Sequence, residues 1–150
     1  SISGEVAATL FASTTGTDAD WVVKLIDVFP PEVRSNPELG GYQLMVSADI
    51  LRGRYRESLE HPKAAEPGVV APCRVRMPEA NHTFLPGHRI MVQVQSSWFP
   101  LYDRNPQTFV ENIAKAEPGN YRSATHRIWL APGQASYVEL PVVGTRKLIP

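Results

Sequence analysis

Prolines divide this chain into segments that are too short for most helices. The 150 residues include 14 prolines, about twice the usual share of ~5%. A proline inside a helix removes a backbone hydrogen bond and clashes with the preceding turn, whereas strands of about five or six residues fit between such breaks. The proline spacing therefore predicts an all-β chain.

Alternation of apolar and polar residues supports this prediction and places the strands. Residues 21–29 are apolar on both faces apart from Lys24 and Asp27, a pattern typical of a central strand that is buried on both sides. The other segments alternate with a period of about two residues, as strands with one buried face do. The predicted strands are residues 5–13, 21–29, 42–48, 73–77, 90–97, 127–130 and 137–143.

Turn signals separate these segments, and a series of short strands joined by turns is typical of a β-sandwich. Helical structure is expected in one or two short pieces at most, within residues 105–116 and as a turn within residues 54–59. Residues 61–70 have the composition of a loop. The inward-facing positions predict a core that includes Leu10, Val23, Leu25, Leu44, Val75, Val92, Val94 and Ile128.

Length and charge limit the partners that we expect. A chain of 150 residues can form one domain, residues 1–150, with a core of its own. Lys and Arg (15) balance Asp and Glu (15), so the chain lacks the field on which binding to nucleic acid or an acidic membrane relies. No apolar run approaches the roughly 18 residues of a membrane helix. We therefore expect a soluble protein with no nucleic-acid or membrane partner. The sequence does not identify the compartment, and a bacterial cytoplasm or periplasm is the expectation.

The sequence starts at Ser1 without an initiator methionine or a signal-peptide pattern, and we expect it to be a piece of a longer protein. Within it, no catalytic pattern is complete. The nearest match to the Gly-x-Ser-x-Gly turn of a serine hydrolase starts at Gly133 and lacks the second glycine. Cys73 occupies an inward-facing strand position, which favours an inert core cysteine. The histidines show no metal-site spacing, so we predict no catalytic residue, no metal ion and no cofactor.

Asp18 and Asp20 form a small acidic pair just before a predicted strand. Carboxylates at this spacing can supply oxygen ligands to calcium. Because no further carboxylate is close in the sequence, a turn that begins the strand is favoured over a calcium site.

Arg52, Arg54 and Arg56 form a basic cluster. If their segment is extended, the three guanidinium groups lie on one face. Three interpretations remain open: a solvated or ion-paired strand, a docking face for another domain, or a ligand site for carboxylates or phosphates. If the arginines pair with buried carboxylates, Asp27 and Asp103 are the expected partners.

An aromatic run follows the strand predicted at residues 90–97. Trp98, Phe99 and Tyr102 lie close together in a loop bounded by prolines. Aromatic side chains are costly to leave in water, so the run must bury something. Either the loop folds back over the end of the sandwich, or it forms a wall that faces a partner domain or a cleft.

Four segments taken together resemble one known family. They are residues 18–28 (DADWVVKLIDV), 51–56 (LRGRYR), 86–89 (PGHR) and 96–106 (SSWFPLYDRNP). In this order they are similar to the C-terminal domain of the X-Pro dipeptidyl-peptidase and cocaine-esterase family, which includes α-amino-acid ester hydrolases and glutaryl-7-aminocephalosporanic acid acylases. The resemblance implies a jelly-roll sandwich of the galactose-binding-like type. It also implies a preceding α/β-hydrolase domain that holds a Ser-His-Asp triad and cleaves ester or amide bonds.

The resemblance gives this chain a supporting role, because the triad has no counterpart among its residues. The expected partner is the α/β-hydrolase domain of the parent chain, and homo-oligomers are also considered. Alternatives are a carbohydrate-binding module on the same fold and a free-standing interaction domain. The residues placed at an interdomain junction or cleft are Asp18, Asp20, Trp21, Trp98, Phe99, Tyr102, Asp103 and Asn105. Those given a structural polar role are Arg52, Arg54, Arg56, His88 and Arg89.

Overall fold

The computed structural model describes residues 1–144 and confirms the all-β prediction. The strands are β1 (Ile2–Thr14), β2 (Asp20–Val28), β3 (Gln43–Arg52), β4 (Ala71–His82), β5 (Arg89–Gln95), β6 (His126–Ile128), β7 (Leu130–Ala131), β8 (Gln134–Ala135) and β9 (Tyr137–Glu139). The helical pieces are single 3-10 turns at Pro37–Leu39, Gly53–Tyr55, Ile113–Lys115 and Pro118–Asn120. In residues 1–144, no helix is long and apolar enough to cross a membrane.

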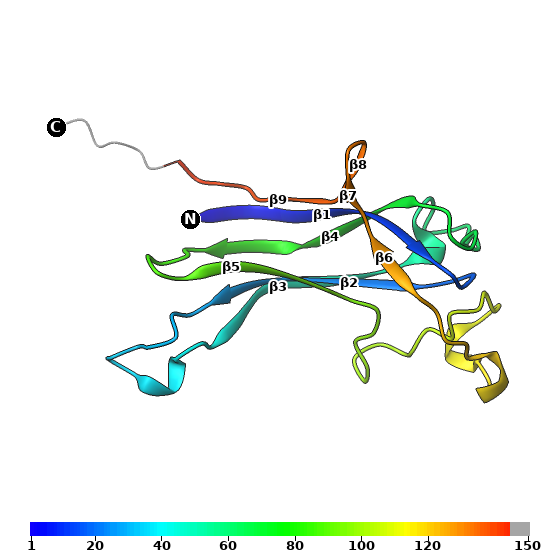
Figure 1. The fold of residues 1–150 in the computed structure, drawn as a ribbon, viewed down its shortest axis with the longest axis horizontal. Coiled ribbons are helices and arrows are strands. Elements are labelled where there is room, and N and C mark those ends of the chain that lie inside the picture. Colours follow the sequence, from blue (N-terminus) through cyan, green and yellow to red (C-terminus); the bar gives the residue numbers. More distant parts are fainter. Residues whose placement is uncertain (145–150) are drawn as a thin grey trace.

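The longer strands form two antiparallel sheets that face each other in a sandwich-like arrangement. The β1 sheet has the order β4-β1-β6, with β9 also paired to β1, and the β2 sheet has the order β3-β2-β5. Figure 1 shows β9, β1 and β4 above β5, β2 and β3, with the loops of residues 53–70 and 105–125 gathered at the right-hand end. The sandwich is thus confirmed, while its galactose-binding-like subtype stays a prediction.

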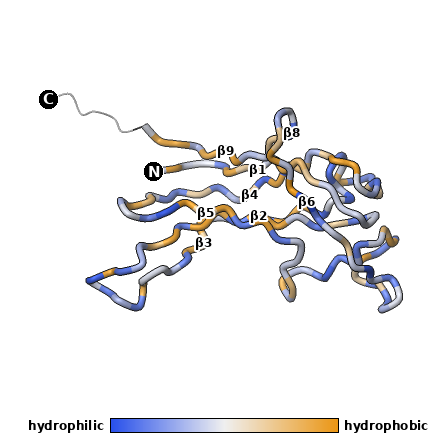
Figure 2. The backbone as a smooth tube through the Cα atoms, viewed as in Figure 1, coloured by the Kyte–Doolittle hydropathy of each residue, from blue (hydrophilic) through white to orange (hydrophobic). Residues whose placement is uncertain are grey.

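The core lies between the two sheets and follows the predicted alternation. From β1 the residues Val6, Ala8 and Leu10 enter the same cluster as Val23 and Leu25 of β2. β2 is the central strand of its sheet, and its residues are buried on both faces apart from Lys24, as the apolar run of residues 21–29 predicts. Figure 2 shows hydrophobic residues concentrated along the strands of both sheets.

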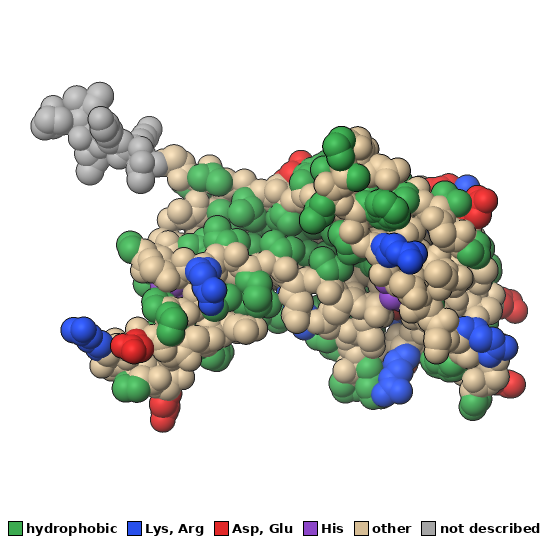
Figure 3. Space-filling model, in the orientation of Figure 1, with side chains coloured by type: hydrophobic (Ala, Val, Ile, Leu, Met, Phe, Trp, Pro, Cys, Tyr) green, Lys and Arg blue, Asp and Glu red, His purple; other side chains and the backbone are tan. Residues whose placement is uncertain are grey.

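The prediction that all the listed core residues are buried is wrong at two positions. Val92 and Ile128 are 41% and 37% exposed. Val92 stands opposite Leu25 in the ladder, so it is on the inward face as predicted, but β5 is the last strand of its sheet. Ile128 likewise lies on the short outer strand β6. Figure 3 shows hydrophobic side chains gathered across the middle of this face of the molecule. Leu44, on the outer strand β3, is only partly buried.

The predicted helix within residues 105–116 is wrong apart from one 3-10 turn at Ile113–Lys115. Side-chain oxygens accept backbone N–H groups of this segment. The backbone N–H of Phe109 donates to Oγ1 of Thr17 at 2.8 Å, and that of Gln107 donates to Oδ1 of Asn105 at 2.9 Å. Such side-chain bonds compete with helix formation.

The strand predicted at residues 137–143 is shorter than expected. β9 ends at Glu139, because Pro141 has no N–H group to continue the ladder. Pro141 still accepts a hydrogen bond from the N–H of Ser3 at 2.9 Å, and an isolated bridge joins Ile2 to Val142. The segment therefore follows β1 without forming a regular strand.

Candidate interaction surface

The three arginines do not share one face, because the strand ends among them. β3 ends at Arg52, and the chain turns through the 3-10 helix Gly53–Tyr55. The N–H of Gly53 donates to the carbonyl oxygen of Ala19 at 2.7 Å, and a Cβ atom at Gly53 would lie 2.6 Å from that oxygen. Only glycine permits this approach, which brings Arg52 and Arg54 to the two aspartates that flank Ala19.

Each of these arginines pairs with one aspartate. Nη1 of Arg52 donates to Oδ2 of Asp20 at 2.9 Å. Nε and Nη2 of Arg54 both donate to Oδ2 of Asp18, at 2.9 and 2.6 Å. The side chains of Arg54 and Asp18 are 3% and 0% exposed, and the guanidinium of Arg54 also stacks on the ring of Phe109 at 4.6 Å. These pairs were not predicted from the sequence. The pattern that could have indicated them is the spacing of Asp-Ala-Asp at residues 18–20, which matches that of Arg-Gly-Arg at residues 52–54.

Asp20 links this network to the loop that carries the aromatic run. Nδ2 of Asn105 donates to Oδ1 of Asp20 at 2.9 Å. Burial raises the pKa of Asp20 to about 6, although the bonds from Asn105 and Arg52 favour the charged form. Within residues 1–144 no group of three or more His, Cys, Asp or Glu side chains could hold a metal ion. The aspartates therefore act as anchors for arginine and asparagine side chains.

Asp27 and Asp103, named as arginine partners, do not pair in this way through their carboxylates. Asp27 is buried and accepts one hydrogen bond on each oxygen, from Nε2 of His82 and Nδ1 of His88, both at 2.8 Å. The backbone carbonyl oxygen of Asp103, and not its carboxylate, accepts a hydrogen bond from Nη2 of Arg52 at 3.4 Å. The two histidines thus tie the β4–β5 connection to β2, a contact that no sequence spacing indicated.

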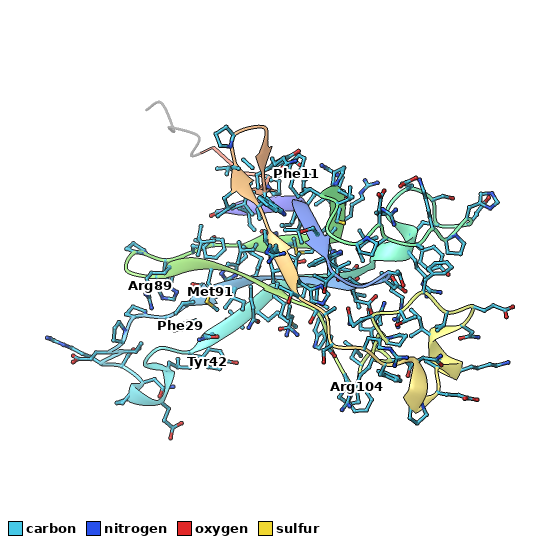
Figure 4. The ribbon with its side chains drawn as sticks, turned by 45° about the vertical axis from the view of Figure 1, so that its right-hand side comes forward. Phe11, Phe29, Tyr42, Arg89, Met91 and Arg104 are labelled. Atoms are coloured by element: carbon cyan, nitrogen blue, oxygen red, sulfur yellow. The ribbon has the colours of Figure 1, made fainter. Side chains whose placement is uncertain are left out.

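Arg89 begins β5 beside this histidine cluster and is exposed. Figure 4 shows Arg89 and Met91 close to Phe29 and Tyr42, at the end of the β2 sheet away from Arg104. The rings of Phe29 and Tyr42 meet edge to face at 5.7 Å between centroids. This end of the sheet is held by aromatic packing and the Asp27 contacts.

The residues predicted at a junction or cleft divide into a buried and an exposed group. Asp18, Asp20, Trp21 and Asn105 are between 1% and 5% exposed, so little of them reaches the outer surface of this chain. The polar groups of Asp18, Asp20 and Asn105 are hydrogen-bonded within the fold, and their place at an interdomain junction stays a prediction. The exposed group is on the loop of residues 98–104.

That loop is anchored at its base and open at its tip. Trp98 is partly buried, lies under Nζ of Lys24 at 4.6 Å, and packs against Tyr102 with ring centroids 6.0 Å apart. Phe99 and Leu101 are 55% and 64% exposed. The charged Asp103 is also exposed. Trp98 and Tyr102 therefore fold back, as the first interpretation of the aromatic run predicts. Phe99 and Leu101 face outward, and a wall that faces a partner domain stays a prediction.

Beside this tip the surface is hollowed. One hollow of about 280 Å³ is lined by Phe99, Arg104, Ala116 and Tyr121 together with Asp103, Ile113 and Ala114. A second hollow of about 350 Å³ shares the last three residues and extends to Arg52, Arg54, Tyr55, Glu111 and Asn112. The guanidinium of Arg104 covers the ring of Phe99 at 4.5 Å. We call the tip and the two hollows the loop-end surface.

The groups that could perform chemistry are engaged or inactive. Burial raises the pKa of the Cys73 thiol to about 11, so the thiol is neutral near pH 7. The hydroxyl of Ser136 donates to the carbonyl oxygen of Trp129 at 2.8 Å and accepts the N–H of Phe11 at 2.9 Å. Nδ1 of His126 is buried without a partner, and burial lowers the pKa of this histidine.

Comparisons with known proteins agree with the resemblance in the sequence. Residues 1–139 match the model of the X-Pro dipeptidyl-peptidase C-terminal non-catalytic domain. The cocaine esterase of Rhodococcus sp. (strain MB1 Bresler) is 39% identical over 142 residues, which are 95% of this chain and 23% of that protein.

Two solved structures have the same fold at higher identity. A crystal structure of an aminopeptidase from the marine sediment archaeon Thaumarchaeota archaeon is 59% identical, with a TM-score of 0.93. A selenomethionine-labelled α-amino acid ester hydrolase is 58% identical, with a TM-score of 0.92. In both cases the match covers 95% of this chain and 23% of the other, so the chain spans about a quarter of the length of its relatives. The chain belongs to the family of X-Pro dipeptidyl-peptidase C-terminal non-catalytic domains.

Proposed function

We propose that this chain is the accessory domain of a larger serine hydrolase, which cleaves ester or amide bonds in an α/β-hydrolase domain outside the chain. The observation that carries the proposal is the kind of relative it matches. These relatives are named as an esterase, an aminopeptidase and an ester hydrolase. This chain corresponds to 23% of the length of each. Most of each relative, three quarters of its length, lies outside the match.

We further propose that the loop-end surface is the face that contacts the catalytic domain. Interdomain contacts bury about 600–1,500 Å² and mix polar with apolar groups. The exposed rings of Phe99 and Tyr121 beside Asp103 and Arg104 have this mixed character. The loop is also held in place, because Asn105 bonds to Asp20 and Lys24 covers Trp98. Contact with another domain would therefore cost little further loss of conformational freedom.

The test uses the larger protein that contains this chain, with Phe99 and Leu101 both changed to Ser. We expect the double variant to unfold at a lower temperature, to be cut faster by protease between the domains, and to hydrolyse an ester substrate with a lower kcat/KM. Tyr137→Ser is the matched control, since Tyr137 is 49% exposed on β9, away from the loop-end surface. It should change none of the three readouts.

Two results would contradict these proposals separately. If the chain of residues 1–150, without the rest of the protein, hydrolysed p-nitrophenyl esters at a rate that depended on one of its own side chains, the accessory role would be wrong. If the double variant behaved like Tyr137→Ser in all three readouts, the catalytic domain would contact a different face.

A further inference from the structure

A cavity of about 230 Å³ lies at the loop end of the sandwich, apart from the loop-end surface. It is formed where the segment after the 3-10 helix Gly53–Tyr55 crosses the ends of β1 and β4. Its floor is made by Ala12, Ala19, Trp21, Ala71 and Cys73, and its outer wall by residues 63–66 and Val69. Ala12, Ala19, Trp21 and Cys73 are each less than 5% exposed, so the cavity reaches the edge of the hydrophobic core.

Hydrogen bonds hold the outer wall away from the floor. The backbone N–H groups of Lys63, Ala65 and Gly68 donate to the carbonyl oxygens of Arg54, Thr17 and Thr14 at 2.7–2.8 Å. The side chain of Arg56, only 11% exposed, adds bonds to the carbonyl oxygens of Lys63 and Ala64 at 2.9 and 3.0 Å. Core packing normally leaves few voids larger than a water molecule. Here a bonded wall preserves a space that closer packing of the loop would remove.

The two hydroxyl groups of the lining already have partners. Oγ of Ser13 accepts the indole N–H of Trp129 at 3.2 Å, and Oγ1 of Thr14 accepts the N–H of Gly16 at 3.0 Å. Among the described residues, the buried side-chain atoms without a partner are Oε1 of Gln107 and Nδ1 of His126, and neither residue lines this cavity. The floor, made by alanines, Trp21 and Cys73, therefore offers mainly apolar surface.

Two basic side chains at the mouth already have partners, while Glu66 also lines the cavity. Nζ of Lys63 lies 3.0 Å from a carboxylate oxygen of Glu57, and the guanidinium of Arg56 donates hydrogen bonds to backbone carbonyl oxygens. A charged ligand would lose its hydration on the apolar floor without finding an ionic partner there, which is unfavourable. An uncharged, flat and apolar molecule loses nothing comparable and gains contact with Trp21 and the alanines.

We propose that this cavity is a binding site for a small, uncharged aromatic molecule of one or two rings. The size follows from the volume, since an apolar protein cavity of about 150 Å³ holds one benzene molecule and this one is larger. The site uses residues outside the loop-end surface and does not depend on the catalytic domain. The inference is therefore independent of the proposed function.

The first experiment titrates the 150-residue chain with indole and follows backbone amide signals by NMR. We expect the largest shifts at Ala12, Ala19, Ala65 and Ala71. Indole-3-acetate and tryptamine carry the same ring with a negative or a positive charge, and we expect both to bind about tenfold more weakly or worse, which corresponds to ~1.4 kcal/mol. Equal affinity for the charged compounds, or no shift up to the solubility of indole, would overturn the proposal.

The second experiment fills the cavity. Ala65→Leu extends a side chain from the outer wall and Ala71→Leu from the floor, and each should weaken indole binding by about tenfold or more, again ~1.4 kcal/mol. Ala135→Leu, at an exposed position of β8, is the matched control and should leave the affinity unchanged. Urea unfolding of each variant verifies that it folds, and two independent filling variants protect against one that does not. Unchanged affinity in a folded filling variant, or shifts centred on Phe99 and Tyr121, would place binding elsewhere.

Discussion

Replacing Arg54 by methionine should destabilise this chain strongly, because it leaves the carboxylate of Asp18 charged, buried and nearly alone. Asp18 accepts both of its bonds from Arg54 on Oδ2, while its Oδ1 accepts the backbone N–H of Ala19 at 2.9 Å. After the change only that last bond remains. Methionine keeps much of the apolar contact with Phe109, so lost packing contributes little. Removing one partner of a buried ion pair costs about 3–5 kcal/mol, a large part of the 5–15 kcal/mol that stabilises an ordinary domain.

The assay is urea unfolding at pH 7, followed by tryptophan fluorescence and circular dichroism. With a dependence of about 2 kcal/mol per molar urea, the loss corresponds to a midpoint lower by roughly 2 M. Arg74→Met is the control, because Arg74 and Glu139 form a pair whose side chains are about half exposed, and such pairs contribute about 0–1 kcal/mol.

A second substitution separates the stranded charge from other effects. Combining Arg54→Met with Asp18→Asn removes the charge, and the double variant should be more stable than Arg54→Met alone. The reasoning would be refuted if Arg54→Met changed stability no more than Arg74→Met does. It would equally fail if Asp18→Asn gave no rescue.

Three further predictions follow from the same structure. Burial raises the pKa of Asp20 from 3.8 to about 6. Between these pH values the folded state holds a proton that the unfolded state has lost. The contribution of Asp20 to the free energy of unfolding should therefore fall by ~3 kcal/mol as pH rises from about 4 to 6. Asp20→Asn should remove this pH dependence of stability. The urea midpoints of the wild-type protein and the variant, measured from pH 3.5 to 7 (roughly the range of the shift), test this. Parallel curves for the two proteins would show that Asp20 does not cause the pH dependence. Leu25→Ala should cost about 2–5 kcal/mol, whereas Val92→Ala, at its cross-strand neighbour, should cost less than ~1 kcal/mol because Val92 is 41% exposed; similar urea midpoints for the two variants would contradict the assigned burial. The isolated chain should associate through the exposed side chains of Phe99 and Leu101, so sedimentation across a concentration series should show a dimer that Phe99→Ser and Leu101→Ser both weaken, and a dimer indifferent to both would lie on another face.

Local chemistry explains which parts of this fold could be predicted. The alternation in residues 5–13 needs no distant partner to be read, because successive side chains of a strand point to opposite faces. The apolar run of residues 21–29 indicates burial on both sides for the same reason, and β2 occupies the central place that such a strand requires. The family could be recognised because its motifs, such as residues 96–106, are continuous in the sequence.

The errors have a common origin in contacts between residues far apart in the chain. Residues 105–116 have a helical pattern, yet the N–H of Phe109 binds Thr17, which is 92 residues away. Val92 has the inward phase that alternation predicts, but its burial depends on whether its strand lies inside the sheet or at its edge. The residues next to Phe109 and Val92 in the sequence indicate neither the bond to Thr17 nor the edge position of β5.

The candidate surface shows the same division. The sequence by itself determined that an aromatic run stands at residues 98–102 and that three arginines stand at alternate positions. Only the tertiary structure decided that Arg54 is buried against Asp18, 36 residues away, and that Asp27 joins two histidines from another part of the chain. The physical reason is that a strand's periodicity is a property of its own backbone, whereas an ion pair or an exposed edge exists only once the fold has placed two distant segments side by side.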